Sequence, residues 1–198
     1  DPIFTEDLKD VVANVFHLGP LVAGDIDSSL VKFLSKRGTI VLDAQGFLRR
    51  RTIGHVIQET STDIRDVIKY VDILKVDSTE SALLTSSQVK KTACSILRNW
   101  GPDEVLITDG SNGSILGCGE KIWHIPAYPT RHPIDPTGCG DTYLAAYVSA
   151  RLIGLSPYKS AHFGSIAASH KIEYSGPLRA NFDVLWKQFK SWGPRPDD

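Results

Sequence analysis

Segments with the pattern of buried strands alternate along this chain with segments of helical periodicity. Mostly apolar runs such as Thr39–Asp43 and Glu104–Thr108 have the length of strands, while Asp25–Lys36 and Ser87–Trp100 repeat apolar residues at helical spacing. Strands that alternate with helices are typical of βαβ units, which build parallel sheets covered by helices on both faces. The sequence therefore predicts a three-layer αβα protein with a mainly parallel sheet.

The other predicted elements continue this alternation. Strands are predicted at Val15–Leu18 and Val71–Val76, a hairpin at Ser114–Cys118 and Lys121–Ile125, and helices at Thr62–Tyr70, Thr142–Leu155, from Ser156-Pro157 to about Ile172, and at Phe182–Lys190. In sheets of this kind the ligand crevice lies beyond the carboxyl ends of the strands. This rule gathers Asp43, Asp77, Thr108 and the segment 135–141 along one edge.

Length and charge limit the classes of function. A chain of 198 residues can bury one sizeable core, so we expect a single domain over residues 1–198. Lys and Arg number 22 and Asp and Glu 23, which gives no indication of a nucleic-acid or membrane partner. The 3 cysteines are far apart and lack metal-binding spacing, as is typical of free thiols in the cytoplasm. No signal peptide or membrane span is evident, so a cytoplasmic protein is expected.

The segment Asp135-Pro-Thr-Gly-Cys-Gly-Asp141 carries the clearest chemical signal. It follows a predicted strand and leads directly into a predicted helix. A loop with two glycines at the start of a helix presents unpaired N–H groups, and the helix dipole adds partial positive charge. We therefore expect the amides of Gly138, Cys139 and Gly140 to hold an anion such as a phosphoryl group.

Asp141 closes this loop, although an acidic side chain is a poor ligand for a phosphate. One interpretation is a general base that accepts the proton of a hydroxyl attacking a bound phosphoryl group. The alternative is an aspartate that only caps the helix, which is a common arrangement. Cys139 allows two interpretations as well, a small residue that contributes its N–H or a reactive thiol at a helix N-terminus. No base is evident near Cys139 in the sequence, which favours the first.

The stretch Asp-Pro-Thr-Gly-Cys-Gly-Asp-Thr-Tyr-Leu-Ala-Ala-Tyr, residues 135–147, resembles the C-terminal motif of the PfkB family of carbohydrate kinases, which have the ribokinase-like fold. The family pattern has Asp, two variable residues, Gly, a small residue, Gly and Asp, and Cys139 stands where Ala is commoner. The resemblance implies a kinase that uses ATP and Mg²⁺ on a sugar or polyol, with Asp141 as the catalytic base.

The resemblance also assigns roles to other positions. Thr108, Gly110 and Gly113 match a Thr-x-Gly-x-x-Gly segment that lines the nucleotide site, and the region around 165–176 covers the adenine in family members. Glu80 matches the Glu of an Asn-x-x-Glu motif near the magnesium–phosphate cluster, while Asp77 replaces the Asn. Two carboxylates at a strand end could hold magnesium, often through water, and magnesium would have to neutralise the negative charge that Asp77 adds near the phosphates. From the residues alone, this segment ends a strand and begins a helix, so the two acids could simply belong to the helix N-terminus.

Further expectations from the resemblance concern cations and the acceptor. Asp135 and Thr137 stand where cation-activated members help to bind K⁺; from the residues alone they would simply form a turn. Asp43 resembles a strand end that faces the acceptor sugar, and the run Arg49–Arg51 is either a solvated charge run or a site for a sugar phosphate. Family members are longer, and their N-terminal portion, with much of the sugar site and the lid that often forms a dimer, has no counterpart here.

Other functions remain open at this point. Some vitamin kinases of the same fold, acting on pyridoxal or hydroxymethylpyrimidine, have a Gly-Thr-Gly-Cys anion loop. A regulatory domain that binds a nucleotide without catalysis could keep the loop, although binding alone does not require Asp141. The only residue that would point to a cysteine-dependent hydrolase is Cys139. No Gly-x-x-x-x-Gly-Lys-Ser/Thr motif is present, so a P-loop kinase is not indicated.

Overall fold

The structure is a computed structural model, and it describes residues 2–52, 55–58 and 64–194. Its contacts divide the chain into two compact units. Unit 1 comprises residues 1–107 and 117–122, and unit 2 comprises residues 108–116 and 123–198. That residues 1–198 form a single domain stays a prediction.

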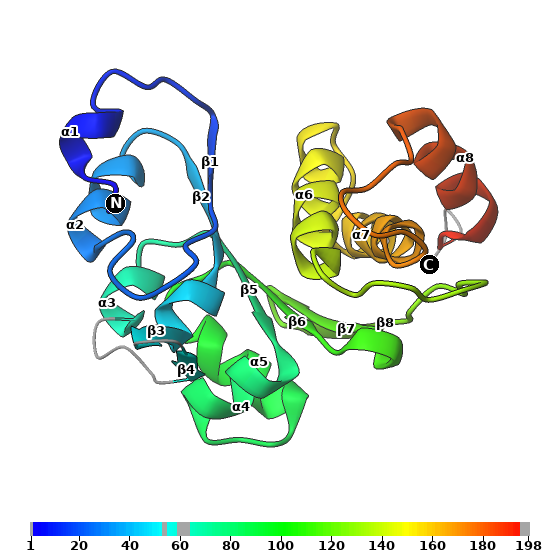
Figure 1. Ribbon diagram of the computed structural model, residues 1–198, viewed down its shortest axis with the longest axis horizontal. Coiled ribbons are helices and arrows are strands. Elements are labelled where there is room, and N and C mark those ends of the chain that lie inside the picture. Colours follow the sequence, from blue (N-terminus) through cyan, green and yellow to red (C-terminus); the bar gives the residue numbers. More distant parts are fainter. Residues whose placement is uncertain (1, 53–54, 59–63, 195–198) are drawn as a thin grey trace. The chain divides into compact units, whose positions relative to one another are not determined.

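Unit 1 is built on parallel strands that lie in the interior. Strands β1 (Val15–Leu18), β2 (Thr39–Asp43) and β5 (Ile73–Asp77) pair in parallel, with Val15 opposite Thr39 and Val41 opposite Ile73. Four consecutive residues of β2 and of β5 are buried, because both faces of a parallel sheet are covered. The three strands lie side by side (Figure 1), and their apolar side chains form much of the core of unit 1.

The described part of unit 1 also contains short helices. They are α1 (Thr5–Leu8), α2 (Ser28–Leu34), α3 (Ile64–Ile68), α4 (Ser78–Thr85) and α5 (Lys90–Arg98). Asp27 caps α2 by accepting a hydrogen bond from the Leu30 N–H at 2.8 Å, and α2 buries Leu30, Val31 and Leu34. The described residues also include a 3₁₀ turn, η1 (Ala44–Leu48), and an antiparallel pair, β3 (Arg49–Thr52) with β4 (His55–Gln58).

Hydrogen bonds join six strands in the order β1-β2-β5-β6-β7-β8. Strand β6 is Glu104–Thr108, followed by the 3₁₀ turn η2 (Gly110–Asn112), β7 (Ser114–Cys118) and β8 (Lys121–Ile125). The two residues between β7 and β8 allow only an antiparallel hairpin, so the sheet is mixed. This agrees with the predicted hairpin.

The described part of unit 2 contains three helices around an aromatic and aliphatic core. Helices α6 (Cys139–Leu152) and α7 (Pro157–Lys171) pack against each other, and α8 (Phe182–Trp192) packs against α7 (Figure 1). The buried cluster consists of Ala146, Ala150, Phe163, Ile166, Ala167, Leu185 and Phe189. Gly164 permits the close approach of α6, because a Cβ there would lie 2.8 Å from the Tyr143 carbonyl oxygen.

Most predicted elements are confirmed, and the differences are local. The predicted helix Ser87–Trp100 is shorter, and Val89, expected on its apolar stripe, precedes the helix and is 61% exposed. Helix α6 begins at Cys139 rather than Thr142, so the end of the glycine loop is itself the first helical turn. The sequence patterns missed α1, both 3₁₀ turns and the β3–β4 pair, all of which are short. Residues 62 and 63 of the predicted helix Thr62–Tyr70 lie outside the described residues.

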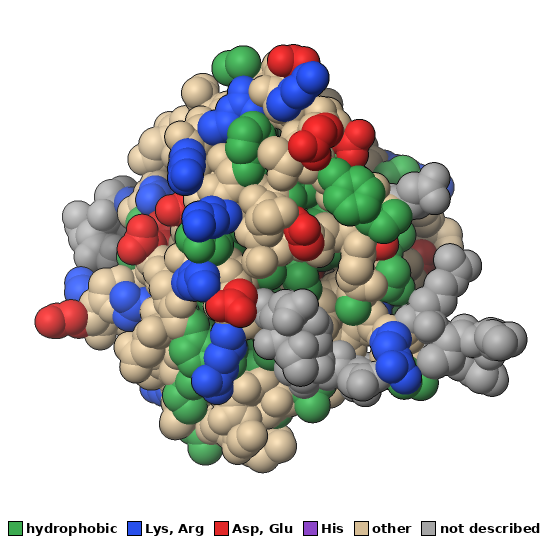
Figure 2. Space-filling model, turned by 90° about the vertical axis from the view of Figure 1, so that its left-hand side faces the viewer, with side chains coloured by type: hydrophobic (Ala, Val, Ile, Leu, Met, Phe, Trp, Pro, Cys, Tyr) green, Lys and Arg blue, Asp and Glu red, His purple; other side chains and the backbone are tan. Residues whose placement is uncertain are grey.

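The surface carries charges of both signs. On the face shown in Figure 2, Lys and Arg side chains are interspersed with Asp and Glu side chains, consistent with a net charge of −1. Among the described residues, no helix combines the length and the apolar character that crossing a membrane requires.

Candidate active site

The anion loop, residues 135–141, changes direction at Gly138 and then becomes helix α6. Gly138 is the N-cap and has φ +78°, a left-handed conformation that a side chain rarely adopts. The Cys139 N–H donates to the Pro136 carbonyl at 3.1 Å. Within the described residues, the N–H groups of Gly138, Gly140 and Asp141 donate to no other group. The donors available to an anion are therefore these three amides, and the Cys139 amide, which we expected among them, serves the turn instead.

Asp141 lies in the first turn of α6, and its side chain is exposed. The N-cap residue is Gly138, and no side chain makes a capping hydrogen bond at this helix end. The alternative of a purely capping aspartate is therefore not what the structure has. An exposed carboxylate beside three unpaired amides is free to accept a proton from a ligand held there.

Cys139 is half-buried, and its thiol points back into unit 2. The sulfur is 3.9 Å from the Asp135 carbonyl oxygen and 3.8 Å from that of Ala168, as expected for a weak S–H donor. Burial raises the pKa of the Cys139 thiol, which the positive charge of Lys171 offsets only in part. A thiol with a raised pKa is a poor nucleophile at neutral pH. The structure therefore favours Cys139 as a small residue of the loop over Cys139 as a reactive thiol.

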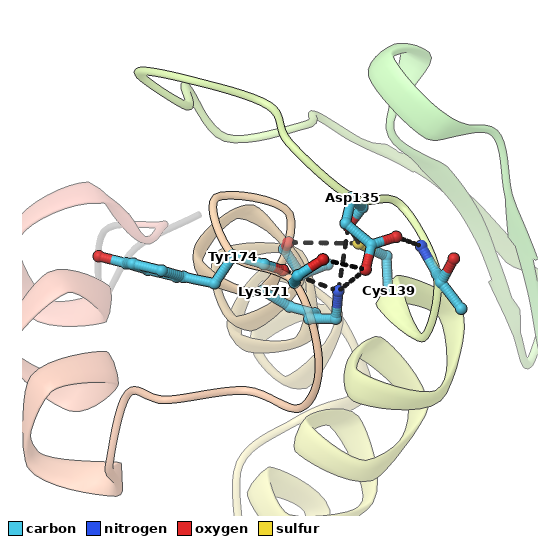
Figure 3. Close-up of polar contacts among 7 residues, drawn as sticks. Asp135, Cys139, Lys171 and Tyr174 are labelled. Carbon is cyan, nitrogen blue, oxygen red and sulfur yellow. Dashed lines mark hydrogen bonds and ion pairs between the residues drawn. The ribbon is translucent and has the colours of Figure 1, made fainter.

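Asp135 holds the start of the anion loop in place (Figure 3). Its Oδ1 accepts the Thr137 N–H at 2.9 Å, and its Oδ2 lies 3.7 Å from the Lys171 ammonium. The hydrogen bonds from Thr137 and the charge of Lys171 lower the pKa of the Asp135 carboxyl. The Ile172 carbonyl accepts the N–H groups of Ile134 and Asp135 at 2.7 and 3.1 Å, so the loop is tied to the end of α7.

A cavity of about 550 Å³ opens beside the anion loop. Cys139 and Gly140 contribute to its wall, and so do Thr108, Gly110 and Gly113, the three residues predicted to line a nucleotide site. The other lining residues are Ser111, Ala127, Tyr128, Pro129, Thr130, Pro133, Pro136, Tyr143, Ser165, Ala168, Ser169 and Ile172. All of them belong to unit 2, and most are apolar, as in sites for small organic ligands.

Gly113 shapes the turn that enters this cavity. Its φ is +84°, and a Cβ there would lie 2.1 Å from the Ile125 carbonyl oxygen, so only glycine fits. Its carbonyl accepts the Asp109 N–H at 2.8 Å, which closes the turn. At Gly110, by contrast, a Cβ would meet no atom within 4 Å, so this glycine leaves open space on the cavity side.

Asp77 and Glu80 form a reciprocal capping box at the start of α4 in unit 1. Asp77 Oδ1 accepts the Glu80 N–H at 2.7 Å, and Glu80 Oε2 accepts the Asp77 N–H at 2.7 Å. Burial raises the pKa of Glu80, and the nearby charge of Asp77 adds to this shift. The second oxygen of each carboxylate makes no hydrogen bond within the described part of the chain, so each can still bind a cation.

These carboxylates do not make a preformed metal cage. Residues 2–52, 55–58 and 64–194 contain no group of at least three His, Cys, Asp or Glu side chains with the spacing of a metal site. Magnesium commonly takes one or two carboxylates and completes its shell with water and phosphate oxygens. The two free carboxylate oxygens of Asp77 and Glu80 fit that donor set.

Asp43 is buried and paired with a lysine that sequence reasoning did not single out. The Lys75 Nζ lies 2.8 Å from Asp43 Oδ2, and the side chains are 5% and 6% exposed. The two residues stand opposite each other on β2 and β5, so the pair joins two neighbouring strand ends. The structure thus brings Asp43, Lys75, Asp77 and Glu80 together in unit 1, and the anion loop and the nucleotide segment together in unit 2.

Lys171 is the second residue that the sequence did not reveal. It occupies the end of an otherwise largely buried helix, and its ammonium contacts a residue 36 positions earlier in the chain. The sequence did contain one signal for Lys171, a charged residue in a helix whose other residues are mostly apolar or small. Such a residue, when buried, needs a partner of opposite charge or a hydrogen-bond acceptor. Arg49 and Arg50 belong to β3, and the side chain of Arg51 lies outside the described residues.

This chain is similar in sequence to known carbohydrate and nucleoside kinases. Residues 28–181 match the family described as pfkB family carbohydrate kinase. The inositol 3-kinase of Zea mays is 26% identical over 181 residues, which cover 89% of this chain and 44% of that protein. The nucleoside kinase of Methanocaldococcus jannaschii is 36% identical over 74 residues, 37% of this chain and 24% of that protein. The chain spans less than half the length of these curated relatives.

Solved structures share the fold. A pyrophosphate-dependent kinase in the ribokinase family, complexed with a pyrophosphate analog and myo-inositol, has a TM-score of 0.83 and 27% sequence identity, covering 95% of this chain and 67% of that chain. This similarity confirms the predicted ribokinase-like α/β fold. Because the family match extends over most of the chain, the protein belongs to the PfkB family of carbohydrate kinases.

Proposed function

We propose that this chain carries the phosphoryl-donor site and the catalytic loop of a kinase that transfers the terminal phosphoryl group of ATP to a hydroxyl of a sugar or polyol. One observation supports this above the others. The free amides of Gly138, Gly140 and Asp141 and the exposed Asp141 carboxylate lie at the start of α6, and Gly140 lines the same cavity as the segment 108–113. Amides that can donate to a phosphate and a carboxylate that can act as a base thus stand beside a cavity of about 550 Å³, which is large enough for a nucleotide.

The chemistry assigned to this site is an in-line displacement. The Asp141 carboxylate accepts the proton of the acceptor hydroxyl, whose oxygen forms a bond to the terminal phosphorus. The bond between that phosphorus and the bridging oxygen breaks, and ADP leaves with the electron pair. The free amides of the anion loop stabilise the charge on the transferring group, which in such reactions is the larger part of catalysis.

The resemblance also implies magnesium. Glu80 and Asp77 are the residues that would hold it, each with one carboxylate oxygen to spare. When bound, magnesium neutralises negative charge on the phosphates of the donor. The resemblance further implies that Asp135 and Thr137 would help to bind K⁺.

The identity of the donor is the first point to test. The cavity volume of about 550 Å³ and its apolar walls suit a base and ribose, which favours ATP. The similarity to a pyrophosphate-dependent kinase at 27% identity makes pyrophosphate the second candidate. Pyrophosphate would contact the anion loop and leave the apolar walls unused.

The acceptor is proposed by class. The relatives include inositol 3-kinases and nucleoside kinases, so polyols, sugars and nucleosides are the acceptors to try first. The longer match to the PfkB motif, over residues 135–147, favours the carbohydrate branch over a vitamin kinase. A cytoplasmic location and a homodimer remain predictions.

The proposal is tested by measuring release of ADP from ATP, or of phosphate from pyrophosphate, across a panel of acceptors with Mg²⁺. The panel holds myo-inositol, ribose, 2-dehydro-3-deoxygluconate, nucleosides and pyridoxal. We expect turnover with ATP and a sugar or polyol. Binding of ATP without turnover on any acceptor would instead support a regulatory nucleotide-binding domain, and turnover on pyridoxal alone would support the vitamin kinase.

The base is tested with Asp141→Asn. Loss of general base catalysis should lower kcat by about 10²- to 10⁴-fold while the affinity for ATP changes little. Asp183→Asn is the matched control, since Asp183 is an exposed aspartate in the first turn of α8. Unchanged turnover in Asp141→Asn would remove Asp141 from the mechanism.

A further inference from the structure

Lys171, the last residue of α7, places an ammonium group inside unit 2. Its side chain is 3% exposed, and the ammonium lies 3.0 Å from the Asp135 carbonyl oxygen and 3.2 Å from the Tyr174 carbonyl oxygen. The Asp135 carboxylate is 3.7 Å away. Figure 3 shows that Tyr174 contributes its backbone, while its ring points away from the ammonium. A buried ammonium is stable only when it is paired in this way, so the position of the charge is well defined.

The groups around this ammonium are those that surround a bound alkali ion. Two backbone carbonyls and a carboxylate, all oxygen ligands, converge on one point from two separate segments of the chain. Rings of carbonyl oxygens replace the water shell of potassium in selective sites. In this protein the positive charge at that point is already supplied by a side chain.

The Lys171 side chain also contacts the backbone of the anion loop. The Lys171 Cε lies 3.6 Å from the point that a Cβ on Gly138 would occupy, so the side chain passes directly beneath the N-cap of α6. The Ser175 hydroxyl donates to Asp135 Oδ2 at 3.4 Å, on the same side of the loop. The charge therefore both fixes the backbone at Asp135 and adds to the positive potential at the loop.

We propose that Lys171 acts as a built-in monovalent cation, which positions the anion loop and removes the need for a potassium ion at Asp135 and Thr137. The effect of Lys171 on turnover rests on the proposed kinase function, whereas its role as an internal cation is a property of the folded chain. The residue touches the loop and not the reacting atoms, so it is a positioning residue.

The first arm of the test is thermal unfolding, which needs no activity. Wild type should unfold at the same temperature in KCl, NaCl and choline chloride at equal ionic strength. Lys171→Ala, which removes the ammonium and leaves its oxygen ligands, should unfold roughly 5–10 °C lower in choline chloride. Added K⁺ or NH₄⁺ should return a large part of that loss, because the cation then occupies the vacated position.

Two variants serve as controls in this arm. Lys171→Met removes the charge but fills the space, so it should be destabilised and gain nothing from K⁺ or NH₄⁺. Lys187→Ala removes an exposed lysine of α8 and should behave as wild type in all three salts. If Lys171→Ala folds in KCl but not in choline chloride, the inference is supported. If it folds in neither salt, or folds equally well in both, the inference is refuted.

The second arm is turnover, measured with the donor and acceptor that wild type uses. We expect wild-type kcat to be the same in potassium and choline salts. Lys171→Ala should lose roughly tenfold or more in kcat in choline chloride, with a smaller change in KM, and recover with NH₄⁺ or K⁺. Specific stimulation of wild type by K⁺ would overturn the proposal. If wild type shows no turnover with any pair of substrates, the proposed kinase function is refuted. The role of Lys171 as an internal cation is then decided by thermal unfolding alone.

Discussion

Two lysines lie almost entirely out of water in this protein, and each is paired with an aspartate. Lys75 and Asp43 link neighbouring strands of unit 1, while Lys171 and Asp135 link α7 to the anion loop of unit 2. Buried ion pairs add little net stability compared with apolar residues, but removal of one partner leaves an uncompensated charge. Such pairs therefore fix the position of one segment relative to another, and substitution of a single partner is destabilising.

This asymmetry gives a prediction at Lys75. Lys75→Met should lower the free energy of unfolding by about 3–5 kcal/mol, because the Asp43 carboxylate stays buried without its cation. The double variant Lys75→Met/Asp43→Asn should recover much of that loss, since the asparagine side chain is neutral and could still accept the Gln45 N–H. Urea denaturation measures each value.

The surface pair of Lys69 and Asp66 supplies the control for Lys75. Its side chains are 48% and 66% exposed at an Nζ–Oδ1 distance of 2.8 Å, so Lys69→Met should change stability little. Equal losses for Lys75→Met and Lys69→Met would contradict the assignment of a buried charge pair.

Glu80 makes stability depend on pH in a defined direction. Burial raises the pKa of this carboxyl in the folded state, so the folded protein holds the proton more tightly than the unfolded chain does. The stability that this proton contributes is present at low pH and is lost as the pH rises through the raised pKa. Glu80→Gln cannot ionise and can still accept the Asp77 N–H.

We therefore expect Glu80→Gln to gain stability relative to wild type as the pH is raised from about 4 to 7. The measurement is urea denaturation at several pH values in EDTA, so that no metal masks the carboxylate. Glu120→Gln removes one exposed glutamate from the β7–β8 turn and serves as the control. A difference between Glu80→Gln and wild type that is constant across this range would be evidence against a raised pKa.

At the scale of elements, the contact of α6 with α7 sets the position of the end of the anion loop. Helix α6 begins within the anion loop, so any shift of the helix moves Gly140 and Asp141 with it. Gly164 on α7 brings the two helices close, because its missing side chain leaves room for the backbone of Tyr143. The hydrogen bond of 2.9 Å between the Tyr143 and Ser114 hydroxyls anchors the same helix to β7.

Gly164→Ala should accordingly destabilise the protein. Alanine favours a helix by up to about 1 kcal/mol over glycine, but overpacking costs typically 1–3 kcal/mol, so we expect a net loss of about 1–2 kcal/mol. Gly19→Ala is the control, since a Cβ there would meet nothing within 4 Å. A stabilised Gly164→Ala in thermal unfolding would show that the helices have room to separate.

Across the whole molecule, the proposed phosphoryl-donor site lies within one of the two compact units. All residues that line the 550 Å³ cavity belong to unit 2. Amide hydrogen exchange should therefore slow on addition of Mg²⁺–ATP at residues 108–113, 127–130 and 138–143, with little change in β1 and β2. Pyrophosphate should protect 138–141 alone. Protection by ATP that is confined to unit 1 would show that the nucleotide binds elsewhere.

The sequence by itself determined what depends on neighbours along the chain. Strand and helix patterns, the Gly138–Asp141 turn and the turn at 110–113 are all contiguous, and local φ, ψ and N–H availability decide their form. Hence the α/β fold and the anion loop could be predicted, while short elements such as α1 and the β3–β4 pair carried too few residues to show a periodicity.

Only the tertiary structure decided which distant side chains meet. Lys171 reaches Asp135 across 36 positions and Lys75 reaches Asp43 across 32, and no local pattern encodes either distance. The engagement of the Cys139 amide in the turn and the inward direction of its thiol likewise depend on how α6 and α7 pack. The physical reason is that the pairing of a buried charge is set by the path of the backbone, which places the partner, and not by the residues beside it.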